Sequence, residues 1–231
     1  MTDVAAAYRT VQSRVDALLR ERADVADVNV PACPLWSVRE TVSHLAGTAQ
    51  DIASLNLQGA GTDTWTQAQI DRHADHSLDE LLDLWAGRAD SVTDILAQGP
   101  QLVGAQAVFD ALTHEHDICG ALGEPGLRTQ DPVFEVAAGF LTAMLDRAIR
   151  RAALPALQLT TPTTGTTQLG DPSTAPGQIA VEMSDFEALR AFGGRRSNRQ
   201  LWALPWQGDP ERLLLTFDGP ALRPPADDLA E

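Results

Sequence analysis

Residues 109–118 constrain the fold more than any other stretch of this sequence, because they give one predicted helix two faces. Apolar residues recur at three-, four- and seven-residue steps and form a stripe that packs against other elements: Val108, Leu112, Cys119 and Leu122. Asp110, His114 and Asp117 stand at positions i, i+4 and i+7 and share a second face. A carboxylate and an imidazole one turn apart form half of a metal site between facing helices. The stretch therefore predicts a helical bundle with a further ligand on another helix.

The second histidine of this stretch, His116, is not that further ligand. Two residues along a helix differ in direction by about 200°, so His114 and His116 cannot bind one ion together. His44 is the better candidate, because it lies beside the apolar stripe of another predicted helix.

Apolar residues at helical spacing predict four more helices, over residues 3–22, 38–52, 78–95 and 132–153. Two of them begin with the pattern of a capping box, Ser37 with Glu40 and Ser77 with Glu80. Residues 56–76 are polar and predict a loop with at most a short helix. Long amphipathic helices with short connections favour an antiparallel bundle.

The pattern changes after Pro155, where short alternating segments replace the helical spacing. Strands are expected at residues 157–160, 178–182 and 213–217, and a short helix at residues 184–192. We therefore expect an α+β chain of two domains, a helical bundle over residues 1–154 and a small α+β domain over residues 155–231.

Charge and composition exclude several functions. The net charge of −15 disfavours nucleic acid and anionic membrane surfaces as partners. The sequence contains no lysine, which excludes Schiff-base catalysis and a Walker-type phosphate loop.

The two cysteines, Cys33 and Cys119, fit no zinc-finger or CxxC spacing. Buried thiols in a reducing cytoplasm are the expectation, rather than a disulfide. No signal peptide or membrane-spanning run is recognisable, so we expect a cytoplasmic protein.

His44, Asp110 and His114 together are suited to a catalytic Zn²⁺ or a similar divalent ion, with an open position for water or a thiol. Each residue also has a purely structural interpretation. His44 alone is typical of a hydrogen-bonded histidine in a helix, and His114 with Asp110 is typical of an ion pair one turn apart. His73 and His76 are expected to be solvated loop residues.

Three segments carry a family resemblance. Residues 33–47, CPLWSVRETVSHLAG, resemble the CPxWxVRxxVxHLAG signature of the mycothiol-dependent maleylpyruvate isomerase family, a branch of the DinB-like metal proteins. Residues 110–118 are similar to its ExxxHxxDL motif, with His114 and Asp117 at the matching positions. Residues 185–210 are similar to its C-terminal domain.

The resemblance implies a DinB-like four-helix bundle that holds a divalent metal, usually zinc, followed by a small α/β domain of sterol-carrier-like shape. His44 and His114 match the two histidine ligands of the family. Asp110 stands where the family has Glu and is one methylene shorter, so either the helix lies closer to the ion or a water mediates the contact. Glu115 points off this face and does not replace it.

The resemblance also implies a thiol cofactor, mycothiol, that is activated for isomerisation or S-transfer on an electrophilic, acidic small molecule. An arginine of the C-terminal domain is implied to hold the substrate or the cofactor, and Arg195 or Arg196 is the match, with Arg196 assigned to the cofactor. The two arginines after Gly-Gly also suit a helix C-terminus, which cations favour. In an acidic chain, the group Arg195, Arg196 and Arg199 is one of few places that welcome an anion.

Two further hypotheses stay open. The replacement of Glu by Asp110 favours a non-catalytic binding or regulatory protein with the same fold. A metal-dependent hydrolase that uses bound water without a thiol is the third. The sequence does not decide between a monomer and a homodimer.

Overall fold

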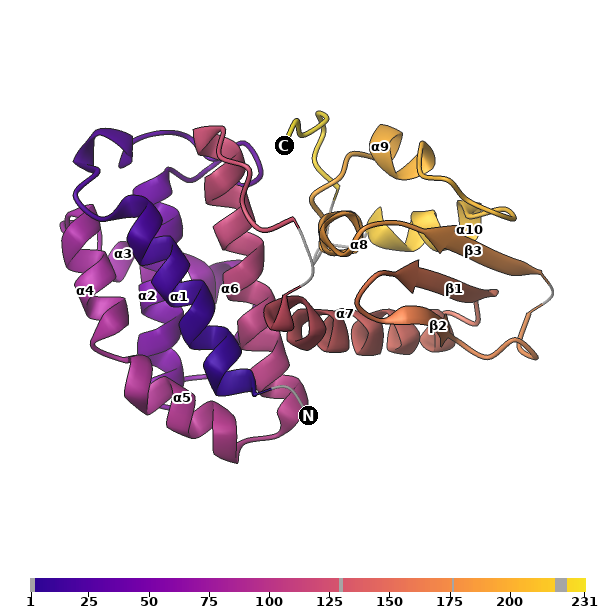
Figure 1. The fold of residues 1–231 in the computed structure, drawn as a ribbon, viewed down its shortest axis with the longest axis horizontal. Coiled ribbons are helices and arrows are strands. Elements are labelled where there is room, and N and C mark those ends of the chain that lie inside the picture. Colours follow the sequence, from indigo (N-terminus) through magenta and orange to yellow (C-terminus); the bar gives the residue numbers. More distant parts are fainter. Residues whose placement is uncertain (1–2, 129–130, 176, 219–223) are drawn as a thin grey trace. The chain divides into compact units, whose positions relative to one another are not determined.

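The computed structural model describes residues 3–128, 131–175, 177–218 and 224–231, and Figure 1 draws it as a ribbon. Side-chain caps begin two of its helices at Ser37 and Ser77, where the sequence predicts them. The Ser37 hydroxyl accepts a hydrogen bond from the Glu40 amide and the Glu40 carboxylate accepts one from the Ser37 amide. Ser77 and Glu80 form the same capping box. Each box supplies partners for amide groups that the first helical turn leaves unpaired.

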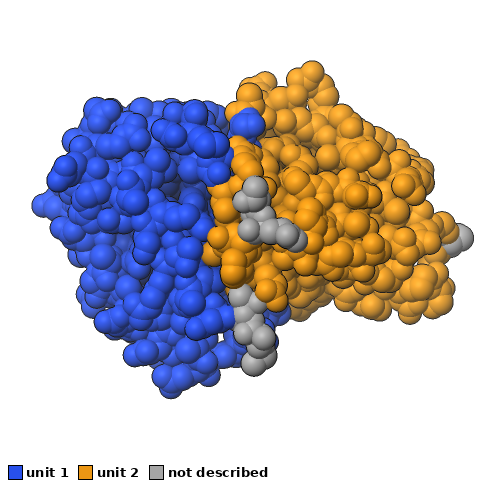
Figure 2. Space-filling model, viewed as in Figure 1, with its two compact units in different colours: residues 1–126, 231 blue, residues 127–230 orange. Residues whose placement is uncertain are grey.

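The chain divides into two compact units, coloured separately in Figure 2. Unit 1 contains residues 1–126 with residue 231, and unit 2 contains residues 127–230. The sequence places the boundary near residue 155, which lies inside unit 2. The helix before that position packs on the elements after it, so it belongs with them.

Unit 1 is helical throughout its regular structure. Its elements are α1 (Val4–Leu19), η1 (Ala23–Val25), α2 (Val38–Ala53), α3 (Asp63–Arg72), α4 (Leu78–Ala86), α5 (Ala89–Gln98) and α6 (Gln101–Leu122). Helix α1 packs on α6 and α5, and α2 packs on α4, α3 and α6. The predicted helix at 78–95 is interrupted at Gly87 and Arg88, so α4 and α5 together take the fourth place of the bundle.

Helix α6 is the central element of unit 1. Every residue from 111 to 119 is buried, including charged and polar ones. Its apolar side chains and those of its neighbours form the core, among them Val11, Val15, Leu45, Leu82, Leu112 and Ile118. Because residues 111–119 are buried, their polar side chains lie among protein groups rather than in bulk water.

Unit 2 combines helices with a three-stranded sheet. Its elements are α7 (Pro132–Arg151), β1 (Ala156–Thr161), β2 (Gly165–Leu169), β3 (Gln178–Glu182), α8 (Asp185–Phe192), α9 (Asn198–Trp202), α10 (Glu211–Leu214) and η2 (Leu215–Asp218). The strand order is β2-β1-β3, with β1 antiparallel to β2 and parallel to β3. Helix α7 packs on α8 and β2.

The predicted α+β class is confirmed, with a DinB-like helical unit followed by a small α/β unit. The strand predicted at residues 213–217 is wrong, because this segment forms α10 and η2. Leu213 and Leu214 are both buried, which suits a helical turn and not a strand with alternating faces. In the part of the chain that the structure describes, no helix is both long and apolar enough to cross a membrane.

Candidate metal centre

Helices α2 and α6 bring the three predicted ligands to one point. His44 on α2 places its Nε2 atom 3.5 Å from Asp110 Oδ2 on α6. His114, one turn further along α6, places its Nε2 atom 3.8 Å from Asp110 Oδ1. One donor atom from each residue lies within 4.8 Å of the other two. These separations suit donors around a single ion, for which ligand bonds of about 2.0–2.2 Å are typical.

A chain of side chains fixes the ring of His44. Gln69 of α3 donates from Nε2 to Asp51 Oδ2 at 2.9 Å, which leaves its Oε1 atom as an acceptor. His44 Nδ1 lies 2.8 Å from that oxygen and must therefore be the donor. Arg72 in turn donates to Asp51 Oδ1 at 3.0 Å. The Nδ1 atom of His44 thus carries a proton, and its Nε2 atom, which faces Asp110, is the nitrogen available to a metal ion.

Asp51 is suited to anchor this chain because it remains charged. Burial alone would raise the pKa of Asp51, but hydrogen bonds from Gln69, Arg72 and Asn56, with the Arg72 charge, outweigh burial and hold the pKa below its ordinary value.

His114 is also suited to bind a metal ion, because burial favours its neutral form. Burial holds the pKa of His114 below its ordinary value, although the carboxylates of Asp117 and Asp110 act in the opposite direction. A neutral imidazole is the form that binds a metal ion. Its Nδ1 atom lies 3.0 Å from Asp117 Oδ2, within hydrogen-bond distance, but the direction of approach does not meet hydrogen-bond geometry. Asp117 nevertheless opposes the effect of burial on the pKa of His114, through its contact with Nδ1 first and through its charge as well.

Trp36 closes the site on one side. Its ring centroid lies 5.3 Å from that of His44 and 5.7 Å from that of His114, and the two imidazoles are 4.9 Å apart. The aromatic ring limits how far either imidazole can rotate, so the donors keep their mutual geometry.

Glu115, which is also in the central stretch, points away from the donor group, as the helical spacing predicts. Both carboxylate oxygens of Glu115 accept hydrogen bonds from Arg14 of α1, at 2.7 and 2.8 Å.

The expectation of a solvated surface for His73 is wrong. His73 lies at the C-terminal end of α3 and is only 5% exposed. Its pKa is lowered by burial first and then by the neighbouring His76.

Gln69 and Asp51 were not identified as site residues from sequence. Gln69 lies in the segment predicted as a polar loop, which contains α3. The available signal was Thr62, which caps this helix. The pairing of Gln69 with His44 depends on how α3 packs on α2, and no local pattern encodes that packing.

Arg195 and Arg196 follow α8 in unit 2. Arg196 is buried and donates from Nε and Nη2 to the Glu187 carboxylate at 2.8 and 3.0 Å. Its Nη1 donates to the Arg195 carbonyl at 2.8 Å, while Arg195 Nη1 donates to the Gly193 carbonyl at 3.2 Å. Arg195 thus bonds a carbonyl at the C-terminus of α8, which is the structural role that the sequence also suggested for this pair. Glu187 orients Arg196.

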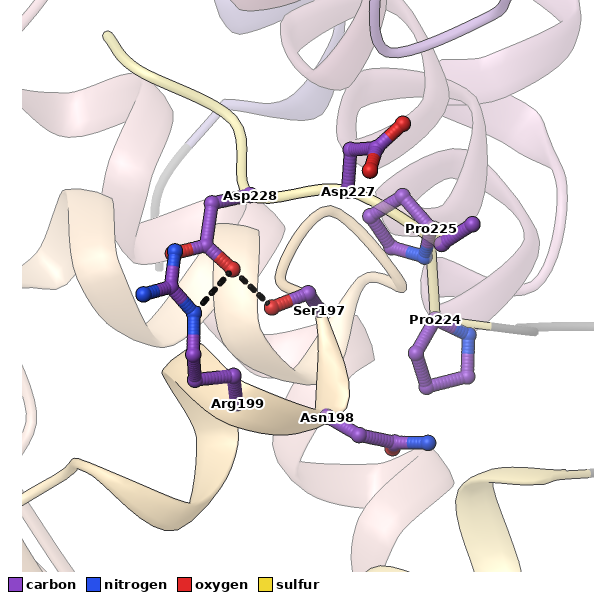
Figure 3. A pocket seen from close by; sticks show the side chains of 8 residues that line it. Ser197, Asn198, Arg199, Pro224, Pro225, Asp227 and Asp228 are labelled. Atoms are coloured by element: carbon purple, nitrogen blue, oxygen red, sulfur yellow. Dashed lines mark hydrogen bonds and ion pairs between the residues drawn. The ribbon is translucent and has the colours of Figure 1, made fainter.

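Arg199, the third arginine of the predicted group, borders a separate pocket of unit 2 of about 570 Å³ (Figure 3). It pairs with Asp228, which also accepts a hydrogen bond from Ser197. Neither Arg195 nor Arg196 lines this pocket, and none of its lining residues belongs to the candidate metal centre. The pocket therefore does not unite the three arginines.

Comparison with known proteins gives two findings. A family model described as "Mycothiol maleylpyruvate isomerase N-terminal domain" matches residues 8–119. No curated protein matches the sequence significantly.

Two solved structures share the fold. A crystal structure of the mycothiol-dependent maleylpyruvate isomerase has a TM-score of 0.56 and 15% sequence identity, covering 84% of this chain and 89% of that one. A histidine-to-alanine mutant of the mycothiol-dependent maleylpyruvate isomerase has a TM-score of 0.55 and 14% identity, covering 83% and 88%. At these identities the likeness concerns the fold.

Proposed function

Because residues 8–119 belong to the mycothiol maleylpyruvate isomerase N-terminal domain family, we propose that this protein is a metal-dependent enzyme that uses a small thiol, mycothiol, to isomerise an unsaturated acid. The observation that carries the proposal is the donor group of His44, Asp110 and His114, whose ligand atoms lie within 4.8 Å of one another.

The donor group fits a divalent ion such as Zn²⁺ in number and in kind. Two imidazoles and a carboxylate are a common set for catalytic zinc, with one position left for a substrate or water. Asp110 is near both Nε2 atoms, at 3.5 and 3.8 Å, although its side chain is shorter than the Glu of the family motif. When bound, such an ion lowers the pKa of a thiol or water placed at the open position.

Each residue around the donor group has a separate role in the proposed function. His44, Asp110 and His114 hold the ion, and Gln69 keeps the proton of His44 on Nδ1. Trp36 packs over both imidazoles and covers one side of the donor group. The thiol cofactor, when bound as thiolate at the open position, would supply a nucleophile that adds reversibly to the double bond of the acid and leaves again as thiolate, so that no oxidant or reductant would be consumed.

An arginine is assigned to the carboxylate of the acid or to the thiol cofactor. Arg196, oriented by Glu187, is the proposed anchor for the cofactor, and Arg195 is its neighbour for the substrate. In a chain of net charge −15, arginine side chains provide the attraction that an anionic ligand requires.

Metal uptake and thiol binding test this proposal in sequence. Metal-free protein is titrated with Zn²⁺ and then with mycothiol by calorimetry in two buffers, which reveals the proton released as the thiol ionises. We expect one ion per chain and proton release on thiol binding. His114→Ala is expected to remove both signals, whereas His76→Ala, outside the donor group, retains them.

Two results would overturn the proposal. One is wild-type protein that takes up no divalent ion. The other is a zinc-loaded protein that binds no thiol and isomerises unsaturated acids such as maleylpyruvate no faster with the thiol than without it.

A further inference from the structure

A second group of metal donors lies on the opposite side of the His114 ring. Cys33, His114 and Asp117 each offer a ligand atom, and these atoms lie within 4.8 Å of one another. Asp117 Oδ2 is 3.0 Å from His114 Nδ1 and 3.5 Å from Cys33 Sγ. We propose that these three residues form a second metal site, which contains sulfur and takes soft or borderline divalent ions such as Cd²⁺, Co²⁺ and Zn²⁺.

The backbone holds Cys33 in place for this role. Its amide donates to the Val30 carbonyl at 2.9 Å, and its carbonyl accepts from the Trp36 amide at 2.7 Å. The thiol thus lies in a fixed turn before α2 and not in a loose loop. The two other donors are on α6 and are almost fully buried, His114 at 5% and Asp117 at 1% exposure.

The donor separations and chemistry indicate the class of ion. Donors at bond lengths of about 2.0–2.3 Å around a tetrahedral ion are about 3.5 Å apart, close to the distances found here. Thiolate and imidazole select soft and borderline ions and give little affinity for Mg²⁺ or Ca²⁺. The thiol proton leaves to solvent when the sulfur coordinates the ion.

The two sites share His114 and therefore exclude each other. The site with His44 and Asp110 uses Nε2 of His114, and the site with Cys33 and Asp117 uses Nδ1. A neutral imidazole has one lone pair available, on one nitrogen or the other. The chain is therefore expected to hold one ion at a time, and soft ions are expected to bind at the site that contains Cys33. This inference is independent of the proposed thiol chemistry.

Cobalt spectroscopy on the full chain tests the second site. The double variant His44→Ala/Asp110→Asn removes the first site and keeps all three donors of the second. We expect it to bind Co²⁺ with a thiolate-to-cobalt charge-transfer band. Adding Cys33→Ser should abolish the band and weaken binding at least tenfold, whereas adding Cys119→Ser, the matched control, should keep the band.

A second measurement uses the wild-type chain and avoids any question of folding. Cd²⁺ is expected to slow alkylation of Cys33 by iodoacetamide more than tenfold, followed by peptide mass spectrometry, and Mg²⁺ is expected to have no effect. Equal alkylation rates with and without Cd²⁺ would overturn the proposal. So would a folded double variant that binds Co²⁺ without the charge-transfer band.

Discussion

At the scale of single residues, the site depends on which ring nitrogen of each histidine carries the proton. Gln69 decides this for His44, because Asp51 occupies its amide group and leaves only its oxygen for the imidazole. Asp117 influences His114 through a charge 3.0 Å from Nδ1. We therefore expect metal affinity to depend on residues that do not touch the ion.

Gln69→Ala tests this dependence. Without the acceptor, His44 can hold its proton on either nitrogen, and the affinity for Zn²⁺ should fall about 10- to 100-fold, as measured by competition with a chelator of known affinity. Gln67→Ala is the matched control on the same helix, because Gln67 is exposed and donates a hydrogen bond to Asp71 one turn further along α3. Equal losses in the two variants would contradict the role assigned to Gln69.

Asp51→Asn tests the charged end of the same chain. The pKa of Asp51 is lowered in the folded protein, so its contribution to stability is present at neutral pH and is lost as the pH falls through the folded pKa. We expect the variant to lose about 1–3 kcal/mol of unfolding free energy at pH 7, measured with urea. The difference from wild type should shrink below about pH 4, near the ordinary carboxyl pKa.

The control for this measurement is Asp71→Asn, an exposed carboxylate on α3, for which a change within about 0.5 kcal/mol is expected. A gap between wild type and Asp51→Asn that stays constant from pH 7 to acid would contradict the assigned charge.

At the scale of elements, the contact between α2 and α3 positions the support of His44. Gly47 allows this contact, because a Cβ atom there would lie 2.5 Å from Gln69 Cβ and 2.9 Å from its Cγ. The two helices thus meet where a glycine faces the residue that orients the ligand. A close approach of this kind requires the residue without a side chain.

Gly47→Ala should therefore weaken both stability and metal binding. Overpacking at this position is expected to cost about 1–3 kcal/mol, measured by urea unfolding, and to lower Zn²⁺ affinity by displacing Gln69. Gly139→Ala in α7 is the contrasting variant, since its new Cβ meets nothing within 4 Å. It should stabilise the chain by about 0.4–1 kcal/mol, and metal affinity that is unchanged in Gly47→Ala would argue against this coupling.

The sequence predicted what periodicity and capping can encode. The capping boxes at Ser37 and Ser77 and the shared face of Asp110 and His114 are local patterns, and the structure contains them. Gln69 and His73 could not be placed in the same way, because their burial follows from the packing of α3 on α2. The segment 213–217 was misassigned because five consecutive apolar and polar residues suit a strand and a short helix equally well.

At the scale of the whole molecule, the residues of the candidate metal centre all belong to unit 1. His44, Asp110 and His114, with Gln69 and Asp51 behind them, lie within residues 1–126. Arg195 and Arg196 belong to unit 2. The ion and the anion are therefore assigned to different units of the chain.

A fragment of residues 1–126 should consequently keep the metal site. We expect it to show the helical circular dichroism of unit 1 and to bind Zn²⁺ within about tenfold of the full chain. The His114→Ala form of the fragment serves as the control and should not bind. A folded fragment without zinc affinity would show that unit 2 supplies something essential to the site.

The division after Gly126 also has an evolutionary consequence. The candidate metal centre lies within unit 1, so sequence changes in unit 2 would leave the geometry of its donors in place. Different substrates would then be reached by changing residues 127–230, while the metal donors of unit 1 stay the same. Chimeras joined at this position would test whether residues 127–230 determine the substrate of the proposed enzyme.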